Sequence, residues 1–409
     1  MPTFTHAAGL FLASWPEYFL ELQIDRLHEK SGTFEVSGEI DVRSTMPGKE
    51  GRLITPSRIN LSAPRTRQQF ANLLAEREPD PRVNWPQLID IAATKCIELF
   101  REGEPGRVVK NIKPREALHY RTRPLIIEGQ SNILFGLGGI SKSYIAQLCA
   151  VLIDTYQEKQ LFESEPGKVG YLDYEADAED FKDRIDRIHK GLGLEQDASE
   201  IVYRACVQPL ANEVTTLRRF TVEHKIDVLV IDSGALACGG APEDAQATLR
   251  FFGALRELGK TSLTICHQAK NLTGAMEKTV FGSAFWQNVA RNVWYAKKDQ
   301  ETGVNQILVG LYHTKANQTK LHSPFAVKVT HESEATYFER GNLLDSPELA
   351  KGAPLHERIA IELKAGSLTD KEIAEKLEKP ESTIRVTLYR HSKLFIKLSA
   401  GKWGLLQKV

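Results

Sequence analysis

The segment from Gly136 to Ser143 reads GLGGISKS and has three glycines in its first four residues. Glycines let backbone N–H groups turn inward around an anion, and the start of a following helix adds partial positive charge. Lys142 would then reach the β- and γ-phosphates of a nucleotide, and the Ser143 hydroxyl would ligate Mg²⁺. The segment therefore predicts a loop that binds ATP and Mg²⁺ through Gly136, Gly138, Gly139, Ser141, Lys142 and Ser143.

Ser141 departs from the G-x-x-x-x-G-K-[ST] pattern, which has a glycine directly before the lysine. The last residue of such a loop packs tightly or takes a backbone conformation that favours glycine. A serine hydroxyl can still donate a hydrogen bond to phosphate, so we expect the protein to bind ATP. Any effect of the serine should fall on the turnover rate. The alternative is a glycine-rich turn that holds no ligand.

Asp232 follows the apolar run Val228–Ile231. A carboxylate that closes a buried strand is costly unless it is paired or bound to a metal. With a phosphate loop in the same sheet, the simplest partner is Mg²⁺, held by Ser143 and Asp232. This is the Walker B pattern, and its combination with the loop is much more specific than either motif alone. The next segment, Gly234–Asp244, is predicted to be a glycine-rich loop.

Two further polar residues follow apolar runs. Glu175 comes just after Val169–Leu172, where a carboxylate can orient and deprotonate an attacking water. We expect its strand to lie beside the strand of the phosphate loop; the alternative is a carboxylate at the start of a helix. His267 follows Leu263–Cys266 and can either touch the γ-phosphate or be satisfied by backbone groups.

The elements that position these residues are short apolar runs that alternate with helical segments after about Pro124. This alternation predicts an α/β fold, with a parallel sheet for the first five runs. Ligands of such sheets bind at the carboxyl ends of the strands, where the residues above are found. The runs are Ile133–Phe135, Val169–Leu172, Ile201–Tyr203, Val228–Ile231, Leu263–Cys266, Val293–Ala296 and Ile307–Leu311.

Residues 1–118 predict a separate, small α+β domain with no catalytic constellation. Thr33–Arg43 alternates apolar and polar residues as a strand or hairpin does, and Leu53–Leu61 adds a short strand. Two helices follow, at Arg65–Arg77 and from about Trp85 to Arg101, because their apolar residues recur at helical spacing.

The C-terminal residues 355–409 follow a predicted linker, Leu343–Pro354, that is rich in Asp, Ser, Gly and Pro. Leu355–Leu363 is predicted to be a helix, and the capping box Thr369–Glu372 starts a second one. The third helix covers Glu381–Lys393. Strands at Phe395–Leu398 and Trp403–Leu406 complete a winged helix-turn-helix.

This C-terminal region contains eleven Lys and Arg against seven Asp and Glu, a net charge of +4. The predicted contacts with duplex DNA are Thr383, Arg385 and Arg390 on the presumed recognition helix and Lys402 on the wing. The alternative is a winged helix that binds another protein, since the net charge is modest.

The composition is that of an ordinary globular protein. The 409 residues are 42% hydrophobic with a formal net charge of zero, so any basic surface must be local. The five cysteines are scattered beside apolar residues, which indicates reduced thiols and a cytoplasmic location. The sequence contains no apolar run of membrane-spanning length and no basic leader of a signal peptide, so we expect no membrane association.

The motifs between Gly136 and Asn317 resemble those of RecA-like P-loop NTPases, nearest to the hexameric replicative helicases of the DnaB-like and RepA-like type. The matching segments are GLGGISKS at 136–143, LDYEAD at 172–177, VLVIDS at 228–233, ICHQAK at 265–270, GSAFWQNVARNVWY at 282–295 and HTKAN at 313–317. They follow the family's order and spacing, and the fit is better to the RepA-like group. The resemblance places a RecA-like ATPase domain at residues 119–342.

By this resemblance, Glu175 is the catalytic base, Asp232 is the Mg²⁺-associated acid and His267 is the γ-phosphate sensor. Lys315 lies where related rings present a cationic finger to the neighbouring subunit's nucleotide. The related helicases often have an arginine two residues after this lysine, whereas this chain has Asn317.

The resemblance implies a ring-forming, DNA-associated ATPase, a replicative-type helicase or helicase-like protein of a plasmid, phage or mobile element. Because no other residue supplies an obvious cation within the same subunit, we expect Lys315, or else Arg291, to act on a neighbour's site in a homo-oligomer, most simply a hexamer. Single-stranded DNA would pass through the ring and duplex DNA would bind the winged helix. The alternative is an ATP-dependent DNA-binding switch that does not translocate.

Overall fold

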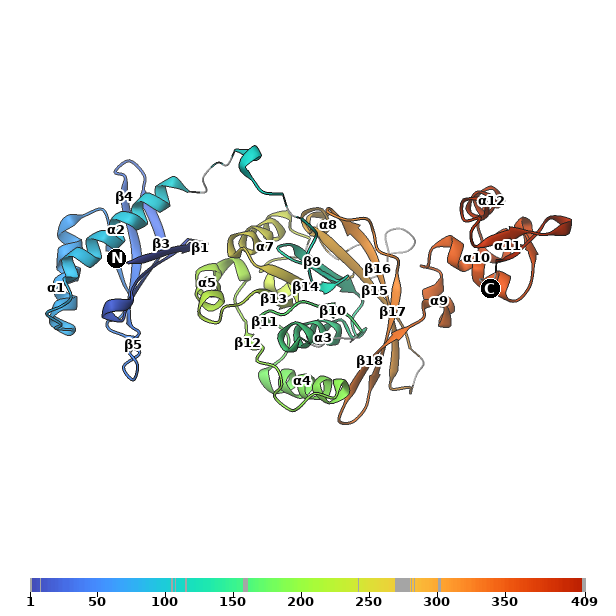
Figure 1. The fold of residues 1–409 in the computed structure, drawn as a ribbon, viewed down its shortest axis with the longest axis horizontal. Coiled ribbons are helices and arrows are strands. Elements are labelled where there is room, and N and C mark those ends of the chain that lie inside the picture. Colours follow the sequence, from blue (N-terminus) through green and yellow to red (C-terminus); the bar gives the residue numbers. More distant parts are fainter. Residues whose placement is uncertain are drawn as a thin grey trace. The chain divides into compact units, whose positions relative to one another are not determined.

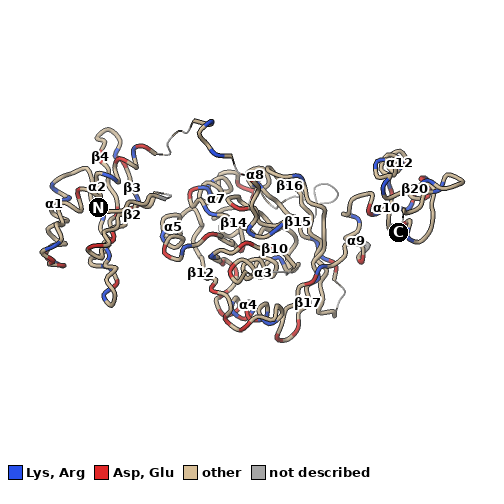
Figure 2. Tube along the Cα trace, viewed as in Figure 1, with Lys and Arg blue, Asp and Glu red and all other residues tan. Residues whose placement is uncertain are grey.

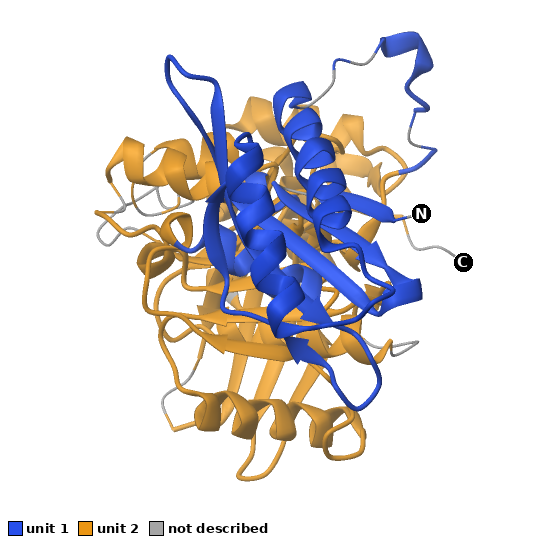
Figure 3. Ribbon diagram, turned by 90° about the vertical axis from the view of Figure 1, so that its left-hand side faces the viewer, with its two compact units in different colours: residues 1–117, 213–223, 257–259 blue, residues 118–212, 224–256, 260–409 orange. Residues whose placement is uncertain are grey.

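The computed structural model describes residues 2–7, 9–103, 106, 108–114, 116–156, 161–241, 243–268, 280, 282, 284–300 and 303–406. The chain forms two compact units (Figure 3). Unit 1 comprises residues 1–117, 213–223 and 257–259, and unit 2 comprises residues 118–212, 224–256 and 260–409. Within the described ranges, no helix is long and apolar enough to cross a bilayer.

Unit 1 contains a six-stranded antiparallel sheet and three helices: β1 Thr3–Ala7, β2 Leu10–Trp15, β3 Leu20–Lys30, β4 Glu35–Ser44, β5 Gly51–Arg52, β6 Ser57–Asn60, α1 Pro64–Arg77, α2 Trp85–Glu102 and α5 Val214–Glu223. The strands run in the order β1-β2-β3-β4-β5, with β6 also paired to β4. The two predicted strands correspond to β4 and β6, and the two predicted helices to α1 and α2. The first three strands were not predicted, although buried Leu20, Leu22 and Ile24 alternate with more exposed residues in β3.

Unit 2 is organised around a nine-stranded sheet: β9 Ser131–Gly136, β11 Val169–Asp173, β12 Val202–Ala205, β13 Val228–Asp232, β14 Thr261–His267, β15 Asn292–Asp299, β16 Gln306–Ala316, β17 Phe325–His331 and β18 Thr336–Gly341 (Figure 1). All seven predicted runs overlap with these strands, which confirms the α/β class. The order is β12-β11-β13-β14-β9-β15-β16-β17-β18. The strands from β12 to β15 are parallel, and the rest pair antiparallel.

One expectation about strand order is wrong. The strand that precedes Glu175, β11, does not lie beside the loop strand β9, because β13 and β14 lie between them. Local periodicity identifies strands but carries no information on which strand pairs with which. Glu175 must therefore approach the loop across the carboxyl ends of two other strands.

Helices cover both faces of this sheet. Figure 1 shows α3 (Lys142–Thr155) and α4 (Ala178–Leu192) on one side, and α7 (Ala245–Leu258) and α8 (Ala284–Val289) on the other. Helix α3 is buried at ten of its 14 positions, far more than a single apolar stripe requires. The loop before it is therefore held by a rigid helix in the core of the unit.

Two predicted loops are partly ordered secondary structure. The segment after Ser233 begins with a short helix, α6 (Gly234–Ala237). The predicted linker contains another, α9 (Pro347–Ala350), whose Leu349 is fully buried and accepts a hydrogen bond on its carbonyl from the Tyr312 hydroxyl at 2.8 Å. The polar composition of this segment predicted an unstructured linker, but its few apolar residues, such as Leu349, are buried and support a helix.

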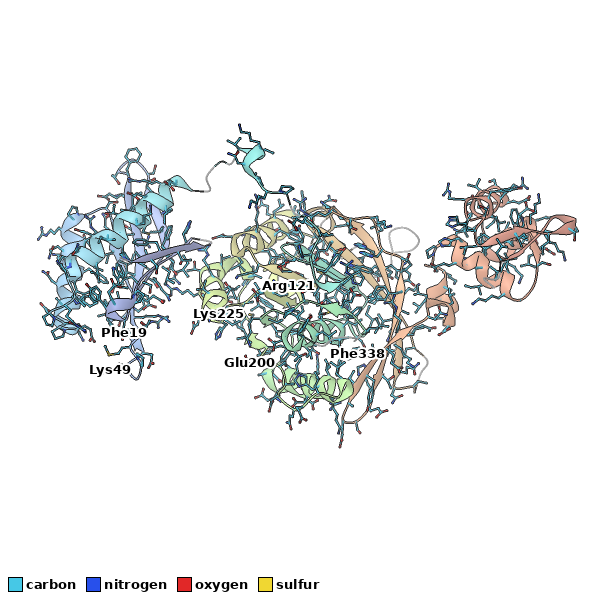
Figure 4. The ribbon with its side chains drawn as sticks, in the orientation of Figure 1. Phe19, Lys49, Arg121, Glu200, Lys225 and Phe338 are labelled. Carbon is cyan, nitrogen blue, oxygen red and sulfur yellow. The ribbon has the colours of Figure 1, made fainter. Side chains whose placement is uncertain are left out.

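A small sheet in unit 2 combines β7 Tyr120–Arg123, β8 Ile126–Ile127 and β10 Glu163–Ser164. Arg121, labelled in Figure 4, donates to Glu128 at 2.6 Å and to the Pro166 carbonyl at 2.5 Å. These bonds fix the chain as it enters β9.

Residues 355–406 contain α10 Leu355–Lys364, β19 Leu368–Thr369, α11 Asp370–Leu377, α12 Glu381–Arg390, β20 Phe395–Lys397 and β21 Lys402–Leu405. The predicted capping box is present at the start of α11, where Thr369 and Glu372 exchange hydrogen bonds. The helices and the sheet β19-β21-β20 enclose a hydrophobic cluster of their own, which includes Ile373, Leu388 and Trp403.

Candidate functional site

The loop between β9 and α3 needs its first glycine for steric reasons. A Cβ atom at Gly136 would lie 2.3 Å from the Ala296 carbonyl oxygen, so no larger residue fits. Gly139 has a φ of +68°, and Ser141 also takes the left-handed conformation, with φ 62° and ψ 26°. Ser141 thus has the backbone geometry that the glycine of the pattern would have.

Lys142 points into the loop. Its ammonium is buried and donates to the carbonyls of Gly136 at 3.1 Å and Leu137 at 2.6 Å. Burial lowers the pKa of Lys142, while the negative charge of Asp232 acts in the opposite direction. A cation held inside the loop is correctly placed to bind the phosphate groups of a nucleotide.

Asp232 closes β13 and is 6% exposed. Burial raises its pKa, while hydrogen bonds from the hydroxyls of Ser143 and Tyr171 lower it; the Tyr171 bond is 2.8 Å long. The residues fit a magnesium ion, because a buried carboxylate and the Ser143 hydroxyl face each other with no Lys or Arg ion pair to Asp232 among the described residues. Mg²⁺ keeps several waters and takes phosphate oxygens, so a site with few protein ligands is expected. Accordingly, no cluster of three metal-binding side chains is found in the described ranges.

Asp173 fixes the turn that presents Glu175. Its Oδ1 accepts the backbone N–H groups of Glu175 and Ala176, both at 2.9 Å, at the end of β11. The cap of the following helix is Asp177, which accepts the N–H of Asp180 at 2.8 Å. The helix-start role considered for Glu175 therefore belongs to Asp177.

The Glu175 carboxylate lies between two polar side chains. Its Oε1 accepts from the Ser233 hydroxyl at 2.5 Å and lies 3.5 Å from Nε2 of His267. The hydrogen bond from His267 is the main reason that the pKa of Glu175 is lowered; burial opposes it, and Ser233 and Lys142 add to the lowering. Both side chains remain accessible, with 44% of Glu175 and 40% of His267 exposed. Glu175 is an ionised base that a water molecule can reach.

One cavity of about 250 Å³ brings these groups together. It is lined by seven of the predicted residues, namely Gly139, Ser141, Lys142, Ser143, Glu175, Asp232 and His267, and by Ile140, Tyr144, Arg184 and Ile265. Gly136 and Gly138 shape the loop without lining the cavity. The residues predicted to bind phosphate, to hold a metal and to act as a base thus line one cavity.

Arg184 corrects the expectation that no other cation serves the site from within the subunit. It projects from α4 into the cavity, with its guanidinium carbon 5.7 Å from the centre of the Tyr144 ring. The signal was present in the sequence, because Arg184 lies three residues after Phe181 and four before Ile188, on the apolar face of the helix. Lys298 is a second nearby cation and donates to the Gly139 carbonyl at 3.1 Å.

Lys315, the predicted finger, binds backbone carbonyls of its own chain in the structure. Its ammonium donates to the carbonyls of Gln287, Asn288 and Ala290, each at 2.7 Å, and so caps the end of α8. A positive charge on the last carbonyls of a helix is a favourable arrangement. Arg291, which follows Ala290, is exposed and forms no ion pair with any residue in the described ranges.

Of the predicted DNA contacts, Thr383, Arg385 and Arg390 belong to α12, and Lys402 is the first residue of β21. Figure 2 marks Lys and Arg in blue and Asp and Glu in red along the described chain. Arg385 is already bound by Asp370 at 2.9 Å and Glu381 at 2.5 Å. Sequence reasoning missed Val386 and Tyr389, which are each 54% exposed on the same helix.

Comparison with known proteins finds a similarity over the part of the chain that contains this site. Residues 103–272 match the model of a family described as an AAA domain. No curated protein matches the chain. Among solved structures, the chain is similar to a KaiC-like protein from the hyperthermophilic archaeon Pyrococcus horikoshii OT3, at 14% identity and a TM-score of 0.37, covering 54% of this chain and 93% of that chain. The family match spans the loop, Glu175, Asp232 and His267.

Proposed function

We propose that the protein is a RecA-like P-loop ATPase and the subunit of a ring-forming, DNA-associated motor of the helicase type. The observation that carries the proposal is the separation of two sets of groups on one sheet. The hydrolytic set lies at the carboxyl end of the parallel strands. Arg291, an exposed cation that forms no ion pair with any described residue, lies at the opposite end.

Hydrolysis would use the residues of the cavity in distinct roles. The loop N–H groups and Lys142 hold the phosphates, and Ser143 and Asp232 hold Mg²⁺, which offsets the phosphate charge when bound. Glu175 accepts a proton from the water as the water oxygen attacks the γ-phosphorus and the bond to the bridging oxygen breaks. His267, against the Glu175 carboxylate, keeps this base ionised and adjoins the position of the γ-phosphate.

The location of Arg291 supports assembly. Its backbone N–H donates to Ser131 at the first residue of β9, whereas the phosphate loop follows the last residue, Gly136. Five residues of extended strand separate these ends by roughly 16 Å. Arg291 is therefore a better candidate than the capped Lys315 for a cation that completes a neighbour's site, and head-to-tail repetition of this contact closes a ring. We propose a hexamer.

DNA association rests on residues 355–406. The order of α11, α12, β20 and β21 suits a winged helix-turn-helix in which α12 enters the major groove and Lys402 lies on the wing. The net charge of +4 over residues 355–409 favours this use.

A second candidate is an ATP-dependent switch that does not translocate and whose C-terminal region binds a protein. The exposed Val386 and Tyr389, and the two acidic partners of Arg385, favour it.

The proposal is tested by electron microscopy of the full chain with an ATP analogue, together with DNA-stimulated ATPase and strand-separation assays. A closed six-fold ring that separates strands supports the motor. A Lys142→Ala variant, which should bind ATP at least tenfold more weakly on the scale of charged hydrogen bonds, is the matched negative control. A monomer that hydrolyses ATP at the full rate would exclude the ring.

A further inference from the structure

Ser141 occupies a left-handed backbone position in the phosphate loop. A side chain disfavours that conformation, so a non-glycine residue remains there only when its surroundings hold it. The residue that contacts Ser141 therefore determines how the loop is held in this backbone conformation.

The group beside Ser141 is His331, the last residue of β17 and 190 positions away in sequence. Its Nε2 lies 3.4 Å from the Ser141 hydroxyl. On the other side, its Nδ1 lies 3.5 Å from the hydroxyl of Thr336, which is buried at the start of β18. The imidazole therefore joins the loop to the β17–β18 hairpin.

The same ring also contacts the first turn of α3. The centres of the His331 and Tyr144 rings are 4.5 Å apart, with the ring planes inclined by 62°. The backbone N–H of His331 donates to the Asn305 carbonyl at 2.8 Å, which fixes the position of the histidine. A rigid strand end thus touches both sides of the Lys142–Ser143 pair.

We propose that His331 is a positioning residue for ATP binding: it holds the Ser141 hydroxyl and so supplies the restraint on the loop that replaces a glycine. This inference rests on the proposed ATP binding and names a residue far outside the loop pattern. His331 acts through Ser141 and Tyr144 and has no place in the hydrolytic step.

The charge around the ring is consistent with this role. Burial, assisted by the nearby Arg187 of α4, lowers the pKa of His331, so the ring is neutral near pH 7. The neighbours from the phosphate loop, α3 and β18 are the uncharged Ser141, Tyr144 and Thr336, and Arg184 lies beyond the Tyr144 ring. A neutral ring can accept a hydrogen bond from the Ser141 hydroxyl at its Nε2 atom.

The experiment is a double-mutant cycle on the full-length protein. His331→Ala, Ser141→Gly and the double variant are compared with the wild type by titration with a fluorescent ATP analogue and by steady-state ATPase assays. In the serine background, His331→Ala should raise Kd and KM roughly three- to tenfold, the scale of one lost hydrogen bond, and leave kcat within about twofold. In the Ser141→Gly background, the same change should have less than about a twofold effect, because no hydroxyl remains to be held.

The control is His322→Ala, which removes a partly buried, hydrogen-bonded imidazole from the segment between β16 and β17 without touching the phosphate loop. It should leave Kd unchanged. His331→Gln retains a hydrogen-bonding group and should recover part of the affinity, and it serves as the test variant if His331→Ala does not fold.

Equal effects of His331→Ala in both backgrounds, or the same loss in His322→Ala, would reduce His331 to a packing role and overturn the inference. If the wild type itself binds no ATP analogue, the proposed function falls and the inference with it. If it binds ATP and the cycle shows no coupling, only the inference falls.

Discussion

The backbone N–H of Arg291 donates to the carbonyl of Ser131 at 3.1 Å. This bond places Arg291 at the entrance of β9, whereas the phosphate loop leaves the same strand at Gly136. A side chain at one end of a parallel sheet cannot serve the nucleotide of its own subunit at the other end. The relationship therefore separates Arg291 from the cations of the cavity, Lys142 and Arg184.

Arg291→Ala should lose hydrolysis while retaining ATP binding. If Arg291 stabilises the charge on a neighbour's γ-phosphate, turnover falls by roughly 10³-fold or more, the scale for such arginines. Mixing Arg291→Ala with Lys142→Ala subunits should restore part of the activity, because a hybrid interface combines an intact loop with an intact arginine. Lys315→Ala instead should lower the free energy of unfolding by about 1.5–3 kcal/mol, since it removes the cap of α8. Normal turnover in Arg291→Ala would exclude the proposed action of Arg291 on a neighbour's γ-phosphate.

Glu175→Gln should keep ATP affinity and lose roughly 10²- to 10⁴-fold in turnover, the range for loss of a general base. Glu179→Gln is the matched control, because Glu179 is an exposed carboxylate in the first turn of α4 and outside the cavity. Single-turnover assays with saturating ATP measure the chemical step directly. Comparable rates in the two variants would remove Glu175 from catalysis.

His267→Ala should shift the pH dependence of hydrolysis. The hydrogen bond from His267 is the largest cause of the lowered pKa of Glu175. In the wild type, the base is therefore ionised at pH values below its ordinary 4.5, and its contribution to stability is lost only as pH falls through the lowered pKa. Without His267, the pKa rises and the acid limb of the pH–rate profile moves to higher pH. An unmoved acid limb would show that another group sets it.

Arg184→Ala should weaken ATP binding or turnover by roughly ten- to a hundredfold, if its guanidinium makes a charged hydrogen bond to the nucleotide. Arg187→Ala is the control, because Arg187 lies one turn along α4 and pairs with Asp183 at 2.9 Å, outside the cavity. Isothermal titration with an ATP analogue distinguishes binding from chemistry. An unchanged Kd and kcat would leave Arg184 a packing partner of Tyr144.

The double variant Arg390→Ala, Lys402→Ala should weaken duplex DNA binding by the full-length protein. Each lost phosphate contact should reduce the slope of log K against log salt by about 0.9. Lys364→Ala with Lys376→Ala removes the same charge from α10 and α11 and should have a smaller effect, as fluorescence anisotropy across a salt series can measure. Equal losses in both pairs would point to bulk charge, and no DNA binding at low salt would favour the protein-binding alternative.

The sequence by itself determined the glycine-rich loop between β9 and α3 and the acid that ends β13. Both features are encoded by neighbouring residues. The glycine spacing predicts a loop that can bind an anion, and an aspartate at the end of an apolar run predicts the end of a strand. The position of Ser141 before Lys142 also marked, without any fold, a backbone conformation that glycine favours. The strands of unit 2 followed from the same local patterns, since apolar runs between helical segments need no knowledge of distant residues.

Only the tertiary structure decided which of these groups meet. The strand order placed two strands, β13 and β14, between β11 and β9, so Glu175 reaches the cavity through the Asp173 turn and its contacts with Ser233 and His267. The tertiary structure also showed that Lys315 donates to carbonyls at the end of α8, that Arg184 lines the cavity and that His331 lies beside Ser141. Periodicity encodes which face of an element is buried, whereas the packing of elements distant in sequence determines what that face touches.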